Sequence, residues 1–359
     1  MSLSPIGISA FAIALPSNIR TNDYWRQKYP QLVAMAEEKT LARTFSPIEP
    51  SSKTLLFDEE MQPFLADPFR GTIERRILAN GETALMLESR AARSALAALK
   101  MSPGDIDLMI CCSFLPAQIG PGNAAFLCNE LEFQGTAWNL ESTCSSVLQA
   151  LHTAAALVKA EQYRNVLVVV SCSYSLYAEE SDSLSWFLGD GAGAFVISRL
   201  NAGEGILGVK SINTADTCGT FYYELAKDAN GEPCIRMGAS KNTSKRLREN
   251  GQDSVQKCCQ AAAKKAGVTL KDIDFFVFNT PLPWYARFCA RALDVDPERT
   301  ISTYPLYANV GPVLPAVNLY HAVKERKINK GDLVMLYTVG SVSSAGAMVM
   351  RWGDVKLGE

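Results

Sequence analysis

The sequence predicts an α/β fold built from two similar halves. Short apolar runs rich in β-branched residues alternate with longer Ala- and Leu-rich stretches of helical period. The segment AARSALAALKMSPGDIDLMIC from Ala91 also aligns with CCQAAAKKAGVTLKDIDFFVF from Cys258, 167 residues later. Each copy predicts a helix, a turn, the tripeptide Asp-Ile-Asp and a strand. Each is followed by a further helix and by a late strand with a glycine-rich turn. We therefore expect one half over residues 1–200 and the other over 201–359, with the break at NAGEG.

Local patterns predict the individual elements. The opening run MSLSPIGISAFAIALPSN has no basic segment, and Pro5 and Pro16 bracket only ten residues, which favours a first strand over a signal peptide. Further buried strands are expected at DLMICCSF (107–114), NVLVVVSCS (165–173) and GAFVISRL (193–200). Long Ala- and Leu-rich helices are expected over residues 82–100 and 145–162.

Residues 21–68 fit neither half. This region mixes aromatic, charged and Ser/Pro-rich segments such as TFSPIEPSSKTLL, and it reads as an insertion packed over the first half. It could be a surface excursion or a cap on an active site, and we favour the cap because long insertions in compact folds are often functional.

The composition argues against a nucleic-acid-binding, membrane-spanning or disulfide-rich protein. A net charge of −2 and a pI near 5.9 give no electrostatic case for binding nucleic acid or an anionic membrane. No run approaches the roughly 18 uninterrupted apolar residues of a membrane span. The ten cysteines are scattered without a Cys-x-x-Cys pair, so we expect no metal site and no disulfide framework, but reduced thiols in a cytoplasmic protein.

Cys144 is the first candidate for chemistry. In NLESTCSSVLQAL it stands at the start of an expected helix, where free N–H groups and the helix dipole favour a thiolate and could also stabilise an oxyanion. A buried structural cysteine is the alternative, and the local pattern alone leaves both open.

Two further segments strengthen the case for an active site. FLGDGAGAFVI has glycines beside a buried strand, with Asp190 placed to tie down the loop. YANVGPVLPAVNLYHAVKERK places Asn309 in a Gly/Pro loop that leads into a helix. The repeat register sets Cys144 opposite Gly311, so the two loops should occupy equivalent places and face one cleft.

Taken in order, GTIERRI, STCSS, FLGDGAGA, YANVG and GSVSSAGAMVMRW resemble motifs of the thiolase superfamily, and most closely β-ketoacyl-ACP synthase III. The resemblance covers nearly all of residues 1–355 apart from the insertion. It implies a thiolase-like fold, an α/β architecture of two duplicated αβα halves in five layers. It also implies a Cys-His-Asn catalytic set, in which the cysteine is Cys144 and the asparagine is Asn309.

The family histidine is missing. Its position, 30 residues before Asn309 in VFNTPLPW, holds Asn279. A carboxamide can donate a hydrogen bond to an enolate or carbonyl oxygen, but it cannot shuttle a proton near neutral pH. Loss of a general acid or base slows a reaction by about 10²–10⁴-fold. His152 and His321 lie far along their helices and are expected to be structural.

Other positions carry further expectations. Glu141, three residues before Cys144, could act as a base with a raised pKa or could pair with a neighbouring donor. The resemblance implies an oxyanion hole from the backbone N–H groups of Cys144 and Ser341. It also implies that Ile119 lines the acyl pocket across a dimer interface. The family's coenzyme A clamp falls near Leu65, Phe69 and Trp284, which do not match it.

The leading expectation is an acyl-thioester transferase that forms an acyl-enzyme at Cys144 from acyl-CoA or acyl-carrier protein, without a cofactor. The acceptor would be an oxygen, nitrogen or sulfur nucleophile, in fatty-acid-like or secondary metabolism such as polyketide synthesis. Decarboxylative condensation with a malonyl thioester, to a β-ketoacyl product, is the alternative. A non-catalytic partner subunit is the third hypothesis. The resemblance implies a homodimer, and neither acyl chain nor acceptor follows from the sequence.

Overall fold

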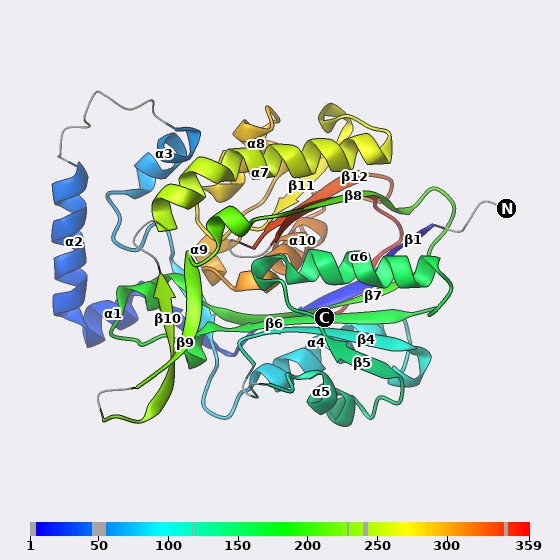
Figure 1. Ribbon diagram of the computed structural model, residues 1–359, viewed down its shortest axis with the longest axis horizontal. Helices are drawn as coiled ribbons and strands as arrows, with labels where there is room; N and C mark the ends of the chain where they lie inside the picture. The colour runs from blue at the N-terminus through cyan, green and yellow to red at the C-terminus, as the bar shows by residue number, and fades with distance from the viewer. Residues whose placement is uncertain are drawn as a thin grey trace.

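Two β-sheets alternate with three layers of helices (Figure 1). The computed structural model describes residues 5–44, 55–116, 118, 120–227, 230–239, 243–340 and 344–359. The first sheet has the strand order β14-β1-β7-β6-β4-β5, and the second has the order β11-β12-β13-β8. The strands of the first sheet are β1 (Ile6–Ala14), β4 (Leu108–Phe114), β5 (Thr136–Asn139), β6 (Val166–Ser173), β7 (Asp190–Arg199) and β14 (Lys356–Leu357). Those of the second are β8 (Gly205–Asn213), β11 (Phe275–Phe278), β12 (Leu333–Val339) and β13 (Ser344–Arg351).

The two sheets repeat one topology. In the first, β1 and β7 are antiparallel, β7 and β6 are antiparallel, and β6 and β4 are parallel. In the second, β8, β13, β12 and β11 pair in the same order with the same directions. The predicted duplication is therefore confirmed at the level of strand order.

The repeated tripeptide Asp-Ile-Asp has the same structural task in both halves. Its first aspartate completes a capping box with Ser102 in one half, and the corresponding aspartate does so with Thr269 in the other. Its second aspartate accepts backbone N–H groups at the start of a neighbouring strand: Asp107 from Asn165, and Asp274 from Leu333. The tripeptide thus joins helix, turn and strand, which explains why the pattern occurs twice.

Helices fill the outer layers and the space between the sheets. α4 (Ala84–Ala98) and α5 (Ala124–Leu131) cover the first sheet, and α7 (Thr243–Ala266) and α8 (Tyr285–Ala292) cover the second. α6 (Ser146–Lys159) and α10 (Leu314–Lys324) lie between the sheets and contact strands of both (Figure 1). Their small buried residues allow close approach of the two sheets.

The inserted region packs against both halves. It begins after β2 (Asn18–Thr21), which pairs with β3 (Glu74–Ile77), and it contains α1 (Asn22–Lys28), α2 (Pro30–Thr44) and α3 (Leu56–Met61). Trp25 of α1 is buried against Phe69 and Trp186 of the first half. Phe57 of α3, however, packs against Trp284 and Phe288 of the second half. The insertion therefore packs over the first half, as the sequence predicts, and over the second half as well.

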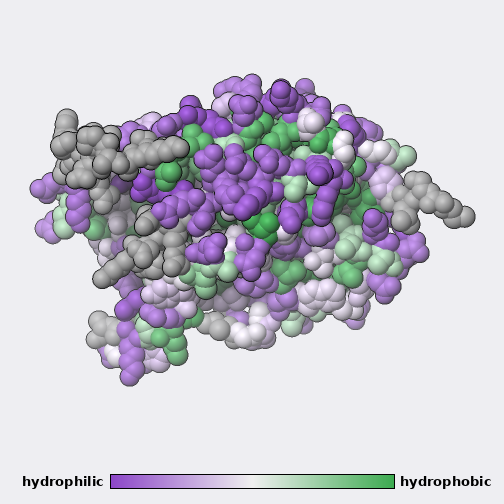
Figure 2. Space-filling model, turned by 45° about the horizontal axis from the view of Figure 1, so that its top comes forward, coloured by the Kyte–Doolittle hydropathy of each residue, from purple (hydrophilic) through white to green (hydrophobic). Residues whose placement is uncertain are grey.

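A hairpin of β9 (Phe221–Lys227) and β10 (Pro233–Ala239) extends from the second half, and the short helix α9 (Tyr304–Tyr307) precedes the Asn309 loop. The face in Figure 2 is mostly hydrophilic, with apolar residues in separate patches. Within the described ranges, no helix has both the length and the hydropathy of a membrane span.

Candidate active site

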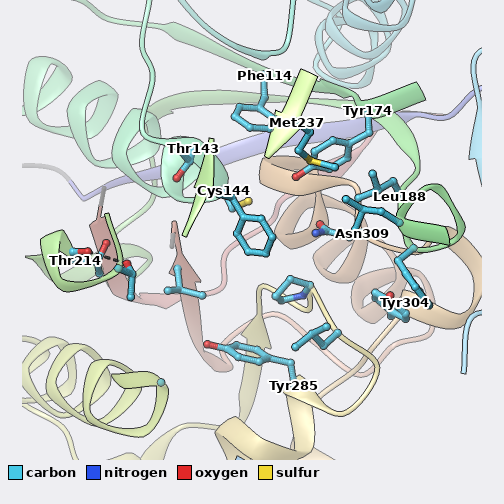
Figure 3. A pocket seen from close by; sticks show the side chains of 18 of the residues that line it. Phe114, Thr143, Cys144, Tyr174, Leu188, Thr214, Met237, Tyr285, Tyr304 and Asn309 are labelled. Carbon is cyan, nitrogen blue, oxygen red and sulfur yellow. Dashed lines mark hydrogen bonds between the residues drawn. The ribbon is translucent and has the colours of Figure 1, made fainter. Parts of the chain in front are cut away.

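A cavity of about 530 Å³ lies where the two halves meet, and both halves and α3 contribute to its wall. Figure 3 shows Cys144, Tyr174 and Asn309 directed into it from different elements. Most of the remaining wall is aromatic. The aromatic residues of the wall are Phe57, Phe114, Tyr174, Phe187, Phe221, Tyr222, Tyr223, Trp284, Tyr285 and Tyr304.

Cys144 occupies a strained turn before α6. The turn is the 3₁₀ segment Thr143–Ser145, and Thr143 has φ of +48°, which is unfavourable for a β-branched residue. The carboxylate of Glu141 accepts the Thr143 N–H and so stabilises this conformation. The strained residue Thr143 is therefore adjacent to the candidate nucleophile Cys144, and this hydrogen bond keeps Thr143 in its strained conformation.

The hydroxyl groups around Cys144 are structural. The Ser142 and Ser344 hydroxyls are 2.7 Å apart, and those of Ser145 and Thr338 are 2.8 Å apart. Both contacts tie the turn to the second sheet, since Thr338 is in β12 and Ser344 in β13. The run STCSS therefore anchors one cysteine between the halves.

The thiol of Cys144 is partly buried, and its neighbours determine its ionisation. Burial raises the pKa of Cys144 to about 11, the nearby Tyr174 hydroxyl acts to lower this pKa, and the charge of Glu141 raises it further. Desolvation by the cavity wall therefore outweighs the helix terminus, which by itself favours a thiolate. Cys144 rests as a neutral thiol.

The Asn309 loop is held from both sides. The Asn309 N–H donates to the Phe187 carbonyl at 2.9 Å, and the Asn309 carbonyl accepts from Gly189 at 3.0 Å. Its side-chain Oδ1 accepts the Gly311 N–H at 2.8 Å, which leaves the Nδ2 group as its donor for the cavity. Ala308, just before it, has φ of +55° and ψ of −153°, a region usually restricted to glycine.

Asn279, at the end of β11, has a different position from the one its motif suggested. It is fully buried and is not part of the cavity wall. Its Nδ2 donates to the Gly311 carbonyl at 3.3 Å, while its Oδ1 has no hydrogen-bond partner within the described part of the chain. The predicted donor is thus directed at the Asn309 loop.

The two loop-to-helix junctions meet as the repeat register predicts. The 3₁₀ turn Gly311–Val313 leads into α10 as the Cys144 turn leads into α6, and the two turns are in contact. Asp190, fully buried, secures the surroundings by accepting the N–H groups of Leu78 and Ser175. Its predicted task of tying down the loop is confirmed.

Both histidines lie away from the cavity wall. His152 is exposed on α6, and His321 bonds to the Tyr307 hydroxyl at 3.0 Å. Partial burial of the rings lowers the pKa of both imidazoles. Neither is placed to assist Cys144.

The three residues at the positions of the family's coenzyme A clamp lie in different surroundings. Trp284 lines the cavity, whereas Phe69 is buried against Trp186 with ring centroids 4.7 Å apart, and Leu65 is outside the wall. Ile119 and Ser341 lie outside the described residues, so the pocket and oxyanion roles of these two stay predictions. Within the described ranges, no three His, Cys, Asp or Glu side chains are grouped as a metal site.

Sequence reasoning missed Tyr174 and the aromatic hairpin. Tyr174 directly follows β6, and β6 runs parallel to β4, whose last residue is Phe114. Ligands of α/β folds commonly bind at the carboxyl ends of parallel strands, so the position of Tyr174 was a usable signal. The hairpin residues Tyr223 and Met237 carry no comparable local signal.

A model of the 3-oxoacyl-[acyl-carrier-protein] synthase III family matches residues 138–216, and a model of its C-terminal part matches 263–352. The β-ketoacyl-ACP synthase III of Brucella abortus is 28% identical over 286 residues, which cover 79% of this chain and 88% of that protein.

Two solved structures share the fold. The priming β-ketosynthase of the R1128 polyketide biosynthetic pathway has a TM-score of 0.79 at 19% identity, covering 98% of this chain and 97% of its own. A variant of Xanthomonas campestris OleA with bound lauric acid and lauroyl-CoA has a TM-score of 0.76 at 17% identity, covering 98% and 100%. The two family models, the curated relative and the fold together support a β-ketoacyl-ACP synthase III-like protein of the thiolase fold.

Proposed function

We propose that the protein transfers an acyl group from a thioester to an acceptor through an acyl-enzyme on Cys144. The observation that carries this proposal is the position of Cys144, which opens into the aromatic cavity opposite Asn309. Acyl-CoA or acyl-carrier protein is the proposed donor, in keeping with the family, and no cofactor is required.

In the first half-reaction, the sulfur of Cys144 attacks the thioester carbonyl. A Cys144–acyl bond forms, the carbon–sulfur bond of the donor breaks, and the thiol proton ends on the departing sulfur. The backbone N–H of Cys144 and the Nδ2 group of Asn309 are the donors suited to the developing negative charge. Because Cys144 rests as a thiol, deprotonation is coupled to attack.

The second half-reaction is transfer to an oxygen, nitrogen or sulfur nucleophile. Two observations favour it over decarboxylative condensation: position 279 has no imidazole, and Asn279 donates to the Gly311 carbonyl. The carboxylate of Glu141 lies on the cavity wall and is the candidate to accept the proton of the acceptor.

The cavity wall favours a bulky or long acyl group. Ten aromatic side chains surround the space, and a cavity of about 530 Å³ far exceeds the needs of an acetyl group. The structural relative with bound lauroyl-CoA gives the same indication, because its fold accommodates a twelve-carbon chain. A homodimer and a cytoplasmic location remain predictions from the family resemblance.

Intact-mass measurement tests the first half-reaction. Incubation with acyl-CoA or acyl-carrier protein thioesters of increasing chain length should add one acyl group, with medium or long chains preferred over acetyl. The adduct should be absent in Cys144→Ala. In Asn309→Asp, which keeps the Oδ1 acceptor for Gly311 but removes the amide donor, acylation should slow by about 10²-fold.

The same preparation separates the remaining hypotheses. Loss of the adduct to amine, alcohol or thiol acceptors, without release of carbon dioxide from malonyl thioester, supports acyl transfer. Carbon dioxide release from the acylated protein would instead establish condensation. No adduct with any donor would point to a partner subunit without catalysis.

A further inference from the structure

A second cavity lies directly behind part of the catalytic cavity wall. It has a volume of about 370 Å³ and is lined mainly by residues 77–82 and by parts of the segment 175–188. Asn80, Gly81 and Leu176 belong to this lining and are exposed at the protein surface, so water can enter the second cavity from outside. The two cavities are separate spaces that share a wall.

The shared wall is one residue thick. Tyr174 and Leu184 line the catalytic cavity, while the residues that follow them, Ser175 and Ser185, line the second cavity. Leu188 lines both cavities, and within the described part of the chain no other residue does so. At this point a single side chain separates the two spaces.

Leu188 is fixed in its position by the loop that carries Asn309. The two residues form a β-bridge, in which the Asn309 N–H donates to the carbonyl of Phe187 at 2.9 Å and the Gly189 N–H donates to the carbonyl of Asn309 at 3.0 Å. Leu188 is 5% exposed and lies beside Asn309 on the cavity wall (Figure 3). The apolar side chain is therefore held next to the group proposed to contact the thioester.

The neighbouring segments are held equally firmly. Ser175 donates its N–H to the buried carboxylate of Asp190 at 2.9 Å, and the buried Arg75 donates from Nε to the carbonyl of Trp186 at 3.0 Å. These contacts fix the backbone on both sides of Leu188. The size of the side chain at position 188 consequently decides whether the two cavities are joined.

The two cavities differ in polarity. The catalytic side is largely aromatic, whereas the second cavity contains the Arg20–Glu180 ion pair, at 2.8 Å, and the Glu82 carboxylate, which accepts the Ala79 N–H at 3.0 Å. Charged groups in an open cavity stay hydrated. An acyl-enzyme on a cysteine is a thioester that water can hydrolyse, and a closed active site protects such an intermediate by excluding water. An apolar side chain at the common point of the two cavities is suited to that task.

We propose that Leu188 is a specificity-determining residue that keeps the water of the second cavity away from the Cys144–acyl thioester, so that the acyl group passes to its acceptor instead of being hydrolysed. This inference rests on the proposed acyl-enzyme. In the reaction that Leu188 suppresses, the oxygen of water bonds to the acyl carbonyl carbon and the bond from that carbon to Sγ breaks. One proton of the water returns to the sulfur, and the carboxylic acid loses the other to solvent.

The decay of a preformed acyl-enzyme tests the inference. Cys144 is acylated with octanoyl-CoA or with p-nitrophenyl octanoate, an activated ester that acylates thiols without any carrier, and peptide mapping confirms the site among the ten cysteines. After the donor is removed, intact-mass measurement follows loss of the adduct in ¹⁸O-labelled water without an acceptor. Leu188→Ala should lose the acyl group about tenfold faster than wild type and release octanoate that carries one ¹⁸O atom.

Two further variants control for the loss of volume. Leu184→Ala removes the same atoms from a residue that lines the catalytic cavity alone, so its decay rate should change by less than about twofold. Leu188→Met keeps the side-chain volume and should decay at the wild-type rate. If Leu188→Ala does not fold, Leu188→Val opens the wall less and should still accelerate decay by about threefold.

Decay at the wild-type rate in Leu188→Ala or Leu188→Val would overturn the inference, and so would an equal acceleration in Leu184→Ala. Failure of the proposed function gives a different result. An adduct that forms from the activated ester, but from no coenzyme A or carrier-protein thioester, would refute the proposed acyl transfer. The decay of that adduct would still show whether Leu188 keeps water from Cys144.

Discussion

Asn279 donates a hydrogen bond from its side-chain amide to the carbonyl oxygen of Gly311, 3.3 Å away. The N–H of the same glycine donates to the Oδ1 of Asn309. Gly311 has φ of +55°, and a Cβ there would lie 3.0 Å from the sulfur of Cys172, so the position requires glycine. The two asparagines thus support one turn from two sides, and only Asn309 lines the cavity.

This arrangement predicts that Asn279→His will not restore condensation. The residue is fully buried and outside the cavity wall, so an imidazole there would meet Gly311 before it met a malonyl group. Carbon dioxide release from labelled malonyl thioester by the acylated protein should stay within about threefold of wild type, where restoring a working acid or base would give about 10²-fold or more. Cys144→Ala provides the background, and a large increase would show that position 279 reaches the substrate.

The sequence predicted the fold well because its strongest signal was duplication. The Asp-Ile-Asp tripeptides marked equivalent strands, and the register placed Cys144 opposite Gly311, as the contact between their turns confirms. The orientation of Asn279 could not be predicted, since it depends on a carbonyl group 32 residues away in the chain.

Long-range packing limited the prediction of the site in the same way. Tyr174 and Cys144 line the same cavity but come from two elements that are distant in the sequence and meet only in the folded protein. The high pKa of Cys144 results from burial by the assembled cavity wall, whereas the local helix start indicated a thiolate. A local sequence motif does not predict a pKa that depends on how far the folded protein removes the side chain from water.

Glu141→Gln should make Cys144 more reactive. The glutamine keeps an oxygen for the Thr143 N–H but removes the negative charge that, after burial, helps to raise the pKa of Cys144. A lower pKa gives more thiolate at pH 8, so alkylation of Cys144 should accelerate about two- to fivefold, and the difference should shrink as pH approaches 11.

The same variant tests Glu141 as a base. If its carboxylate accepts the proton of the acceptor, transfer from the preformed acyl-enzyme should fall by about 10²-fold or more while acylation does not. Transfer at the wild-type rate would limit Glu141 to its structural and electrostatic effects.

Removing the charge of Glu60 should loosen α3 from the second half. Glu60 is 6% exposed and accepts from Arg287 at 3.0 Å and from Arg291 at 2.6 Å. Glu60→Gln should reduce the free energy of unfolding by about 1–2 kcal/mol, because the negative charge is lost and the amide nitrogen cannot accept from one of the two arginines. Chemical denaturation would measure this.

Glu59→Gln is the matched control for that prediction. Glu59 also pairs with Arg291, at 2.9 Å, but its side chain is 46% exposed. Removing the charge of Glu59 should change the free energy of unfolding by no more than about 0.5 kcal/mol. Equal effects of the two substitutions would mean that burial of Glu60 does not strengthen the contact.

Ala308→Gly should be nearly neutral for stability, although it removes a buried methyl group. The loss of that methyl and the greater freedom of the unfolded chain together destabilise by about 1.5 kcal/mol. The backbone of Ala308, however, has φ of +55° and ψ of −153°, where a non-glycine residue is strained by about 1–3 kcal/mol. The two effects oppose each other, so the free energy of unfolding should stay within about 1 kcal/mol of wild type.

Ala316→Gly distinguishes relief of strain from tolerance of any glycine. Ala316 is equally buried, but it lies in the first turn of α10, where glycine adds a helix-propensity loss of up to about 1 kcal/mol to the lost methyl contact. Its destabilisation should reach about 2 kcal/mol in the same denaturation experiment. Similar losses in both variants would show that Ala308 is unstrained.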